Sequence, residues 1–204
     1  MISIRPARPN DSEKAAFLTG LTLGRTADLF IDDQSTMAPE QIISALFVRD
    51  SGRFSYRHGF ILEADDMAAG LLISFSAAKM AMLDLATGIN LFSILGLSAM
   101  TRLTHRMLPM TGVHEAEHGE YYISNVGVHP DYQRRGYGAR LLTFAEEQAR
   151  KLGLKICSLI VNQHNESAIR LYQRYDYKIV QSGEFKGLLT KTEGGYHRMV
   201  KELA

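Results

Sequence analysis

The stretch with the clearest chemical signature is Q-R-R-G-Y-G, residues 133–138. Its two glycines, two positions apart, let backbone N–H groups approach a ligand with no side chain in the way. We expect a helix to begin near Gly136, and the first N–H groups of a helix have no internal partners and carry the positive end of its dipole. With Arg134 and Arg135 as additional donors, this junction is suited to a phosphate or pyrophosphate.

A second stretch, H-E-A-E-H at residues 114–118, matches the H-E-x-x-H pattern of zinc peptidases. That pattern needs a helix, on which the two histidines lie one turn apart on one face. Gly112 and Gly119 leave too few residues for a stable helix, and Tyr121 begins a strand. We therefore interpret the stretch as a polar loop and expect no metal site. A zinc hydrolase is kept as the least favoured alternative, and such a loop can still supply a base to a neighbouring active site.

Two familiar phosphate-binding motifs do not fit residues 133–138. The Walker motif needs G-x-x-x-x-G-K-[ST], and no lysine stands at the required place. The dinucleotide fingerprint needs a third glycine, where this chain has Leu141. The ligand is therefore of another kind.

The order Q-R-R-G-Y-G after V-G-V-H-P resembles the acyl-CoA signature Q/R-x-x-G-x-G/A of the GNAT superfamily of acetyl-CoA-dependent N-acetyltransferases. A second match follows at residues 165–172, N-E-S-A-I-R-L-Y, which is similar to the family's N-x-x-A-x-x-L-Y. Asp176 stands where the family commonly has glycine, and a left-handed backbone tolerates aspartate. The resemblance covers residues 120–185 well and residues 1–75 only in the order of elements.

The resemblance implies an enzyme that transfers an acetyl group from acetyl-CoA to a primary amine by direct attack in a ternary complex. The expected acceptor is a small-molecule amine or a protein N-terminus, and the length of the acyl group stays open. The alternative is an acyl-CoA-binding module of the same fold, which senses or scaffolds without turnover.

The resemblance also implies the roles of particular residues. Tyr172 is expected to protonate the leaving thiolate, and a tyrosine of pKa about 10 is a suitable acid for a thiolate of pKa about 8.5. Acetyl-CoA, as co-substrate, is expected along one strand and the helix that follows it. The residues expected to bind it are Val126, Gly127, Val128, Gln133, Arg134, Arg135, Gly136, Tyr137, Gly138, Ala139, Asn165 and Ala168.

The base for the acceptor amine is less sharply defined. Glu120 and Tyr122 are two positions apart on a predicted strand, so they share a face. Glu117 and His118 come from the adjoining loop. Glu120 is our first choice, against its interpretation as a solvated carboxylate at a strand start. Cys157 lies within a strand with no adjacent base, which favours a buried structural thiol over an acyl nucleophile.

These residues must be positioned by alternating strands and helices. The fold expected is α/β and GNAT-like: a mixed, mostly antiparallel twisted sheet of about seven strands with a splayed central pair, flanked by helices, plus a helical insert. We expect a single domain over residues 1–204. The predicted strands are 2–7, 56–63, 68–75, 120–128, 155–161, 177–185 and 196–202, and the predicted helices are 12–27, 39–49, 136–152 and 165–175.

An apolar insert at about residues 76–118 lies outside the common core of the family. Its apolar residues recur at steps of three and four, which predicts helices with an apolar face; they are Met82, Leu85, Ile89, Phe92, Leu95, Ala99 and Leu103. A break is predicted near Gly88. Roughly 20 apolar residues could span a bilayer, but Asp84 and Asn90 lie inside, so we expect a soluble insert. It would roof the acceptor site or form a homodimer surface.

The composition and net charge are those expected of an ordinary soluble protein. The 204 residues are 46% hydrophobic and 22% charged, with a net charge of +1, so neither nucleic acid nor a membrane is an expected partner. The single cysteine allows no internal disulfide, and the first residues contain no apolar run of signal-peptide length. A cytoplasmic location is expected.

Overall fold

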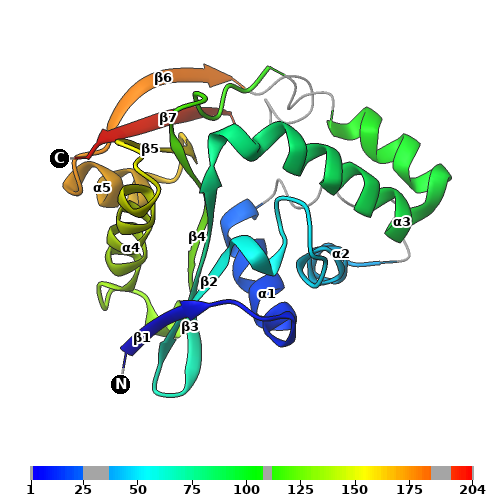
Figure 1. The fold of residues 1–204 in the computed structure, drawn as a ribbon, viewed down its shortest axis with the longest axis horizontal. Coiled ribbons are helices and arrows are strands. Elements are labelled where there is room, and N and C mark those ends of the chain that lie inside the picture. The colour runs from blue at the N-terminus through cyan, green and yellow to red at the C-terminus, as the bar shows by residue number, and fades with distance from the viewer. Residues whose placement is uncertain (1, 25–36, 108–111, 185–193, 204) are drawn as a thin grey trace.

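The computed structural model describes residues 2–24, 37–107, 112–184 and 194–203 (Figure 1). Its centre is a seven-stranded sheet in the order β1-β2-β3-β4-β5-β7-β6. Neighbouring strands run antiparallel except β4 and β5, which run parallel. This arrangement confirms the predicted α/β class, with a mixed and mostly antiparallel sheet.

The elements lie close to their predicted positions. The strands are β1 Ile2–Pro6, β2 Gly59–Ala64, β3 Met67–Ser76, β4 Tyr121–Val128, β5 Ile156–Asn162, β6 Lys178–Glu184 and β7 Gly195–Glu202. The helices are α1 Ser12–Leu23, α2 Pro39–Phe47, α3 Met80–Met107, α4 Tyr137–Lys151 and α5 Glu166–Arg174. The predicted ends at residues 27 and 185 lie outside the described residues. Tyr56–His58 forms a short 3-10 helix instead of the start of β2.

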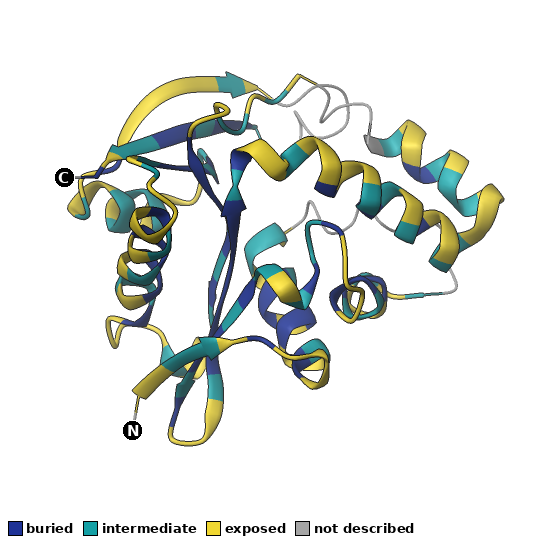
Figure 2. Cartoon of the chain, in the orientation of Figure 1, coloured by how far each residue is buried: buried dark blue, intermediate teal, exposed yellow. Residues whose placement is uncertain are grey.

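Helices cover both faces of the sheet (Figure 1). Leu141 and Leu142 of α4 pack with the strands in one core, and Leu18 of α1 packs with them in another. The strands between these two layers are buried, while the outer sides of the helices are exposed (Figure 2). The chemistry-bearing strands β4 and β5 are therefore fixed from both sides.

Two predicted turns are confirmed by their backbone angles. Asp65 and Asp66, between β2 and β3, have φ of 53° and 62°, as a two-residue hairpin turn requires. Asp176, after α5, has φ of 66°. Aspartate thus occupies the left-handed position that the related family usually gives to glycine.

The insert breaks at Gly96, not near Gly88 as predicted. Gly96 leaves the helical conformation, with φ 75° and ψ 175°, and the chain turns back there (Figure 1). Gly88 stays within the helix, because the residues on either side of it bond to the loop before β2. Thr87 Oγ1 accepts from the Arg53 backbone N–H at 2.8 Å, and Asn90 donates to the Ser51 carbonyl at 2.9 Å. These tertiary bonds support the helical conformation across Gly88.

The predicted apolar stripe of the insert is real, but its first half faces solvent. Met82, Leu85, Ile89 and Phe92 are 50–67% exposed. In this half of α3 the opposite side is buried instead, with Leu91 packed on α2, whereas Leu103 at the end of the stripe is buried against α2 as well. Figure 2 shows this exposed side of α3. Periodicity therefore identified the two sides of the helix without telling which one packs.

Residues 77–106 are long and apolar enough to cross a membrane by length and composition, and only 17% of the most apolar window is buried. The break at Gly96 divides the helix into two parts, Met80–Leu95 and Leu97–Met107. Each part is shorter than the about 20 residues that a span needs. A non-helical break exposed to lipid would also leave backbone groups unsatisfied. The conformation is therefore not that of a single spanning helix.

Candidate active site

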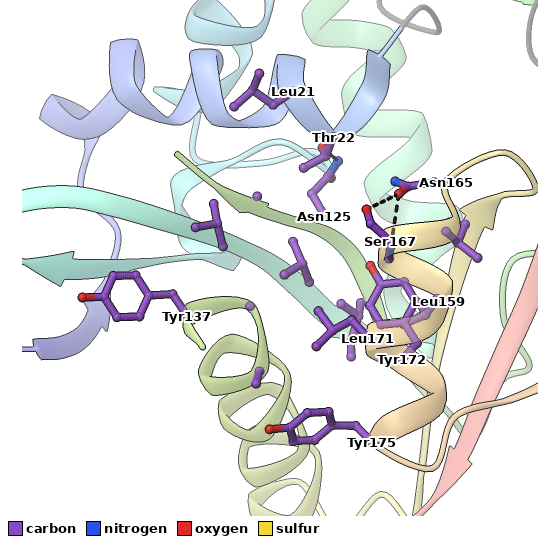
Figure 3. Close-up of a pocket in the computed structure, with 18 of the residues that line it drawn as sticks. Leu21, Thr22, Asn125, Tyr137, Leu159, Asn165, Ser167, Leu171, Tyr172 and Tyr175 are labelled. Carbon is purple, nitrogen blue, oxygen red and sulfur yellow. Dashed lines mark hydrogen bonds between the residues drawn. The ribbon is translucent and has the colours of Figure 1, made fainter. Parts of the chain in front are cut away.

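The parallel pair β4 and β5 comes apart along its length. Tyr121–Ile123 pair with Cys157–Leu159, and no further pairing joins these two strands in the described part of the chain. Beyond this point lies a cleft of about 1000 Å³, which extends to α4, α5 and the end of α1 (Figure 3). The splayed central pair was predicted, and here it forms the cavity.

The start of α4 forms one wall of the cleft. Arg134 and Gly136 have positive φ, 60° and 81°, so the chain turns sharply into the helix. The first helical bond that closes runs from the Arg140 N–H to the Gly136 carbonyl at 3.1 Å. The N–H groups of Tyr137, Gly138 and Ala139 therefore have no partner within the helix. They provide the donors and the dipole end that a phosphate needs.

Most of the residues expected to bind acetyl-CoA line this cleft. They are Val126, Gly127, Val128, Gln133, Arg134, Gly136, Tyr137, Gly138, Ala139, Asn165 and Ala168. Arg135 is the exception, because its guanidinium lies 5.2 Å from the centre of the Tyr132 ring, outside the cleft. Gln133 has a structural task as well, since its side-chain amide donates to the Val128 carbonyl at 3.2 Å. Whether these residues bind acetyl-CoA stays a prediction.

Asn165 caps α5 at the edge of the cleft. Its side-chain oxygen accepts from the Ala168 N–H at 3.1 Å and from the Ser167 hydroxyl at 3.1 Å (Figure 3). This cap explains the spacing between Asn165 and Ala168, because an N-cap side chain accepts from the third helical N–H. The cap fixes where α5 begins and, seven residues later, where Tyr172 lies.

Tyr172 extends from α5 into the cleft (Figure 3). Burial raises the pKa of its hydroxyl to about 12. Its ring lies against that of Tyr177, with centroids 6.1 Å apart. A phenol of this pKa stays protonated at neutral pH, so Tyr172 is available as a proton donor.

Glu120 does not line the cleft and is held in a buried ion pair. Both of its carboxylate oxygens accept from Arg198 Nη2, at 2.5 and 2.6 Å. One oxygen also accepts from the Glu117 N–H at 2.9 Å. The pair is almost fully buried, with side chains 8% and 6% exposed. Its role as base stays a prediction, and this geometry gives it a competing role as the anchor of Arg198.

The H-E-A-E-H stretch is a loop, as expected, and its side chains make structural contacts. Glu115 pairs with Arg53, whose Nε lies 3.0 Å from an Asp84 oxygen of α3. The Arg53 guanidinium also lies 5.7 Å from the Tyr122 ring centre. His114 pairs with Glu117 at 2.8 Å. The described residues contain no group of three His, Cys, Asp or Glu side chains that could hold a metal ion.

Sequence reasoning missed two polar residues of the cleft. Asn125 of β4 donates to the hydroxyl of Thr22 in α1 at 2.7 Å, and both line the cleft. The register between β3 and β4 shifts next to Asn125, with Ser124 skipped. Such a bulge re-aims side chains near a site. The signal was available, because Ser124 and Asn125 interrupt an otherwise apolar strand.

Cys157 is expected to be chemically inert in the folded protein. Its side chain is fully buried, and burial raises the pKa of its thiol to about 12, which leaves almost no thiolate at neutral pH. The native protein should therefore not react with a thiol reagent such as DTNB within minutes, whereas the unfolded chain releases one equivalent of chromophore. Fast reaction of the native protein would contradict the buried position.

The strand order and the cleft between β4 and β5 agree with the predicted GNAT-like fold. The model of the acetyltransferase (GNAT) family matches residues 94–177, which include the cleft strand, α4 and α5. The matched residues include both motifs that carry the resemblance to this family.

Known proteins similar to this chain carry related names. A GCN5-related N-acetyltransferase 6, chloroplastic, from Arabidopsis thaliana is 37% identical over 67 residues, which are 33% of this chain and 23% of that protein. An acetyltransferase from Yersinia pestis (strain Pestoides F) is 30% identical over 67 residues, 33% of this chain and 46% of that protein. The chain thus spans less than half of the length of the curated relatives that it matches.

The fold extends the similarity over the whole chain. The crystal structure of an N-acetyltransferase from Staphylococcus aureus Mu50 superposes with a TM-score of 0.74 at 22% identity, covering 98% of this chain and 100% of that one. At this identity the likeness concerns the fold, so the reaction and its acceptor must be argued from the site.

Proposed function

We propose that this protein is an N-acetyltransferase that transfers the acetyl group of acetyl-CoA to a primary amine. One observation carries the proposal: a single cleft joins the N–H groups at the start of α4, which have no partner within the helix, to the buried hydroxyl of Tyr172. The first feature suits the pyrophosphate of acetyl-CoA. The second suits the departing thiolate.

The reaction proposed is direct attack in a ternary complex. The amine nitrogen attacks the thioester carbonyl carbon, the C–N bond forms, and the C–S bond breaks. The CoA thiolate takes the proton of Tyr172, and the nitrogen loses its own proton to a base or to water. Holding both reactants in one cleft supplies much of the rate through proximity and orientation.

The need for a base depends on the acceptor. Deprotonating an amine of pKa about 10.4 at neutral pH costs roughly 4 kcal/mol, whereas an α-amino group of pKa about 8 costs about 1 kcal/mol. Glu120 stays the predicted base, although both of its carboxylate oxygens are engaged by Arg198. Burial raises the pKa of Tyr122, which keeps that hydroxyl protonated and makes it unsuitable as a base.

The first test is acetyl-CoA binding by calorimetry on EDTA-treated protein. Micromolar affinity with one site per chain, followed by CoA release with a panel of amines, would support the enzyme. Binding without turnover of any amine would favour the acyl-CoA-binding module. The proposal fails if acetyl-CoA does not bind, and metal content would then decide on the zinc alternative.

We also propose that a second copy of this chain covers the exposed stripe of α3. Met82, Leu85, Ile89 and Phe92 form one contiguous apolar side, and such patches mark interaction surfaces. A two-fold axis would bring the same side chains of two copies together. Wild type should sediment as a dimer at micromolar concentration, and Ile89→Glu should sediment as a monomer with unchanged acetyl-CoA affinity. A monomeric wild type would contradict the proposal.

A further inference from the structure

Arg198 of β7 lies next to the point where the cleft opens. It is the direct partner of Ile160 in the β5–β7 ladder, and Ile160 lines the cleft one residue after the β4–β5 pairing ends at Leu159. Directly opposed residues in a ladder point to the same face of a sheet. Ile160 packs in the core on the α1 side, so Arg198 points to that side as well.

The guanidinium of Arg198 is only partly satisfied. Nη2 donates to both oxygens of Glu120, which fixes the group over the sheet. Nε is buried and has no hydrogen-bond partner among the described residues. Arg198 as a whole is 6% exposed. A buried donor without an acceptor is costly, and it points to a ligand or water that the protein alone does not provide.

A second buried group on the same face is also unpartnered. Ser158 is directly opposite Tyr122 in the parallel ladder and Val200 in the antiparallel one, which places it on the face of Arg198. It is 0% exposed, and its hydroxyl has no hydrogen-bond partner in the described part of the chain. Two independent donors thus lie on the α1 side of the sheet, and both neighbour Ile160, which lines the cleft.

This side is the one left for the acceptor. The free N–H groups of α4 and the hydroxyl of Tyr172 belong to helices on the other face. A second reactant must therefore reach the thioester through the gap between β4 and β5, from the face of Arg198. A fixed arginine edge and a hydroxyl on the same face of the sheet match a carboxylate, which accepts hydrogen bonds from both kinds of donor. A carboxylate adds one negative charge next to Glu120, whereas a phosphate adds about two, with the same single arginine to balance them.

We propose that Arg198 and Ser158 bind a carboxylate of the acceptor, so that the acceptor amine belongs to an amino acid or a related amino-carboxylate. The inference rests on the proposed acetyltransferase function and narrows its substrate class. Glu120 is then a positioning residue, because it holds the guanidinium in place. A protein N-terminus, which has no carboxylate near the amine, is disfavoured as acceptor.

The test compares amines that differ only in the carboxylate. Alanine, leucine and glutamine are assayed against their α-amides, with CoA release as the readout and each matching 2-hydroxy acid as an inhibitor without the amine. Wild type should prefer the acid in kcat/KM by on the order of 100-fold, and the hydroxy acid should compete with it. Equal use of acid and amide by wild type would overturn the inference.

The variants must avoid leaving one charge buried alone. The double variant Glu120→Gln/Arg198→Gln removes both charges, and it should abolish the preference for the acid over the amide, measured as the ratio of their kcat/KM values. The control is Glu146→Gln/Lys201→Gln, which removes a similarly buried pair that joins the same strand to α4. That control should keep the preference. If both double variants lower acid and amide equally, the two groups hold only structural water, and the inference is wrong.

The experiments distinguish an error in the carboxylate site from an error in the proposed acetyltransferase function. Absence of acetyl-CoA binding in calorimetry would overturn the proposed function. Binding together with transfer to amides as fast as to acids removes only the carboxylate site. Where no amine is turned over, saturable binding of the 2-hydroxy acids that is lost in Glu120→Gln/Arg198→Gln supports the site, and absence of binding overturns it.

Discussion

Replacing Tyr172 with phenylalanine should lower kcat about 100-fold or more and leave acetyl-CoA affinity within about twofold of wild type. The ring would still fill its place against Tyr177 and Leu171, but the thiolate would lose its proton donor. A positioned general acid typically contributes 10²–10⁴-fold. The measurement is steady-state kinetics with calorimetry of acetyl-CoA on the same samples.

The pH profile gives an independent check on the same residue. Burial raises the pKa of Tyr172 to about 12, so the acid form is present at every lower pH. The wild-type rate should therefore rise as the acceptor amine loses its proton and show no fall up to about pH 10. A rate that falls between about pH 8 and 9 would assign the acid to another group.

Tyr175 provides a matched control for Tyr172. It belongs to the same tyrosine-rich end of α5 and also lines the cleft. Figure 3 shows its ring directed away from that of Tyr172. Tyr175→Phe should change kcat by less than about threefold. Equal losses in the two variants would indicate a packing effect, and full activity of Tyr172→Phe would exclude it as the acid.

Local features were predictable from the sequence because they depend on neighbouring residues. The turn at Asp65 and Asp66, the left-handed Asp176 and the helix start at Gly136 each follow from side-chain chemistry at one place. The splayed pair and the position of Tyr172 followed from the resemblance of two motifs. These were enough to place the cleft between the correct strands.

Features set by distant contacts were not predictable. Glu120 and Arg198 are 78 positions apart, so no sequence pattern near Glu120 indicates its partner. Gly88 and Gly96 are equally able to break a helix, and the choice depends on bonds from Thr87 and Asn90 to the loop before β2. Periodicity in α3 could not tell which of its sides meets α2.

Replacing Gly138 with tryptophan should weaken acetyl-CoA binding about 100-fold or more, which corresponds to about 2.7 kcal/mol. Gly138 provides one of the N–H groups that are unpartnered within α4, and it lines the cleft. A Cβ there would already lie 3.1 Å from a Leu171 methyl carbon. An indole ring must therefore turn into the space over the helix start, where the pyrophosphate is expected. The measurement is calorimetry with acetyl-CoA.

Arg140→Trp is the control for the bulk and apolarity of a new indole. Arg140 is exposed in the same helical turn but does not line the cleft. The Arg140→Trp variant should bind acetyl-CoA with an affinity within about threefold of wild type, and circular dichroism should show that both variants are folded. If Gly138→Trp, although folded, keeps wild-type affinity, the start of α4 does not hold the pyrophosphate. The chain would then share the fold of its relatives without sharing their mode of binding, because a fold alone does not determine the ligand that its cleft accepts.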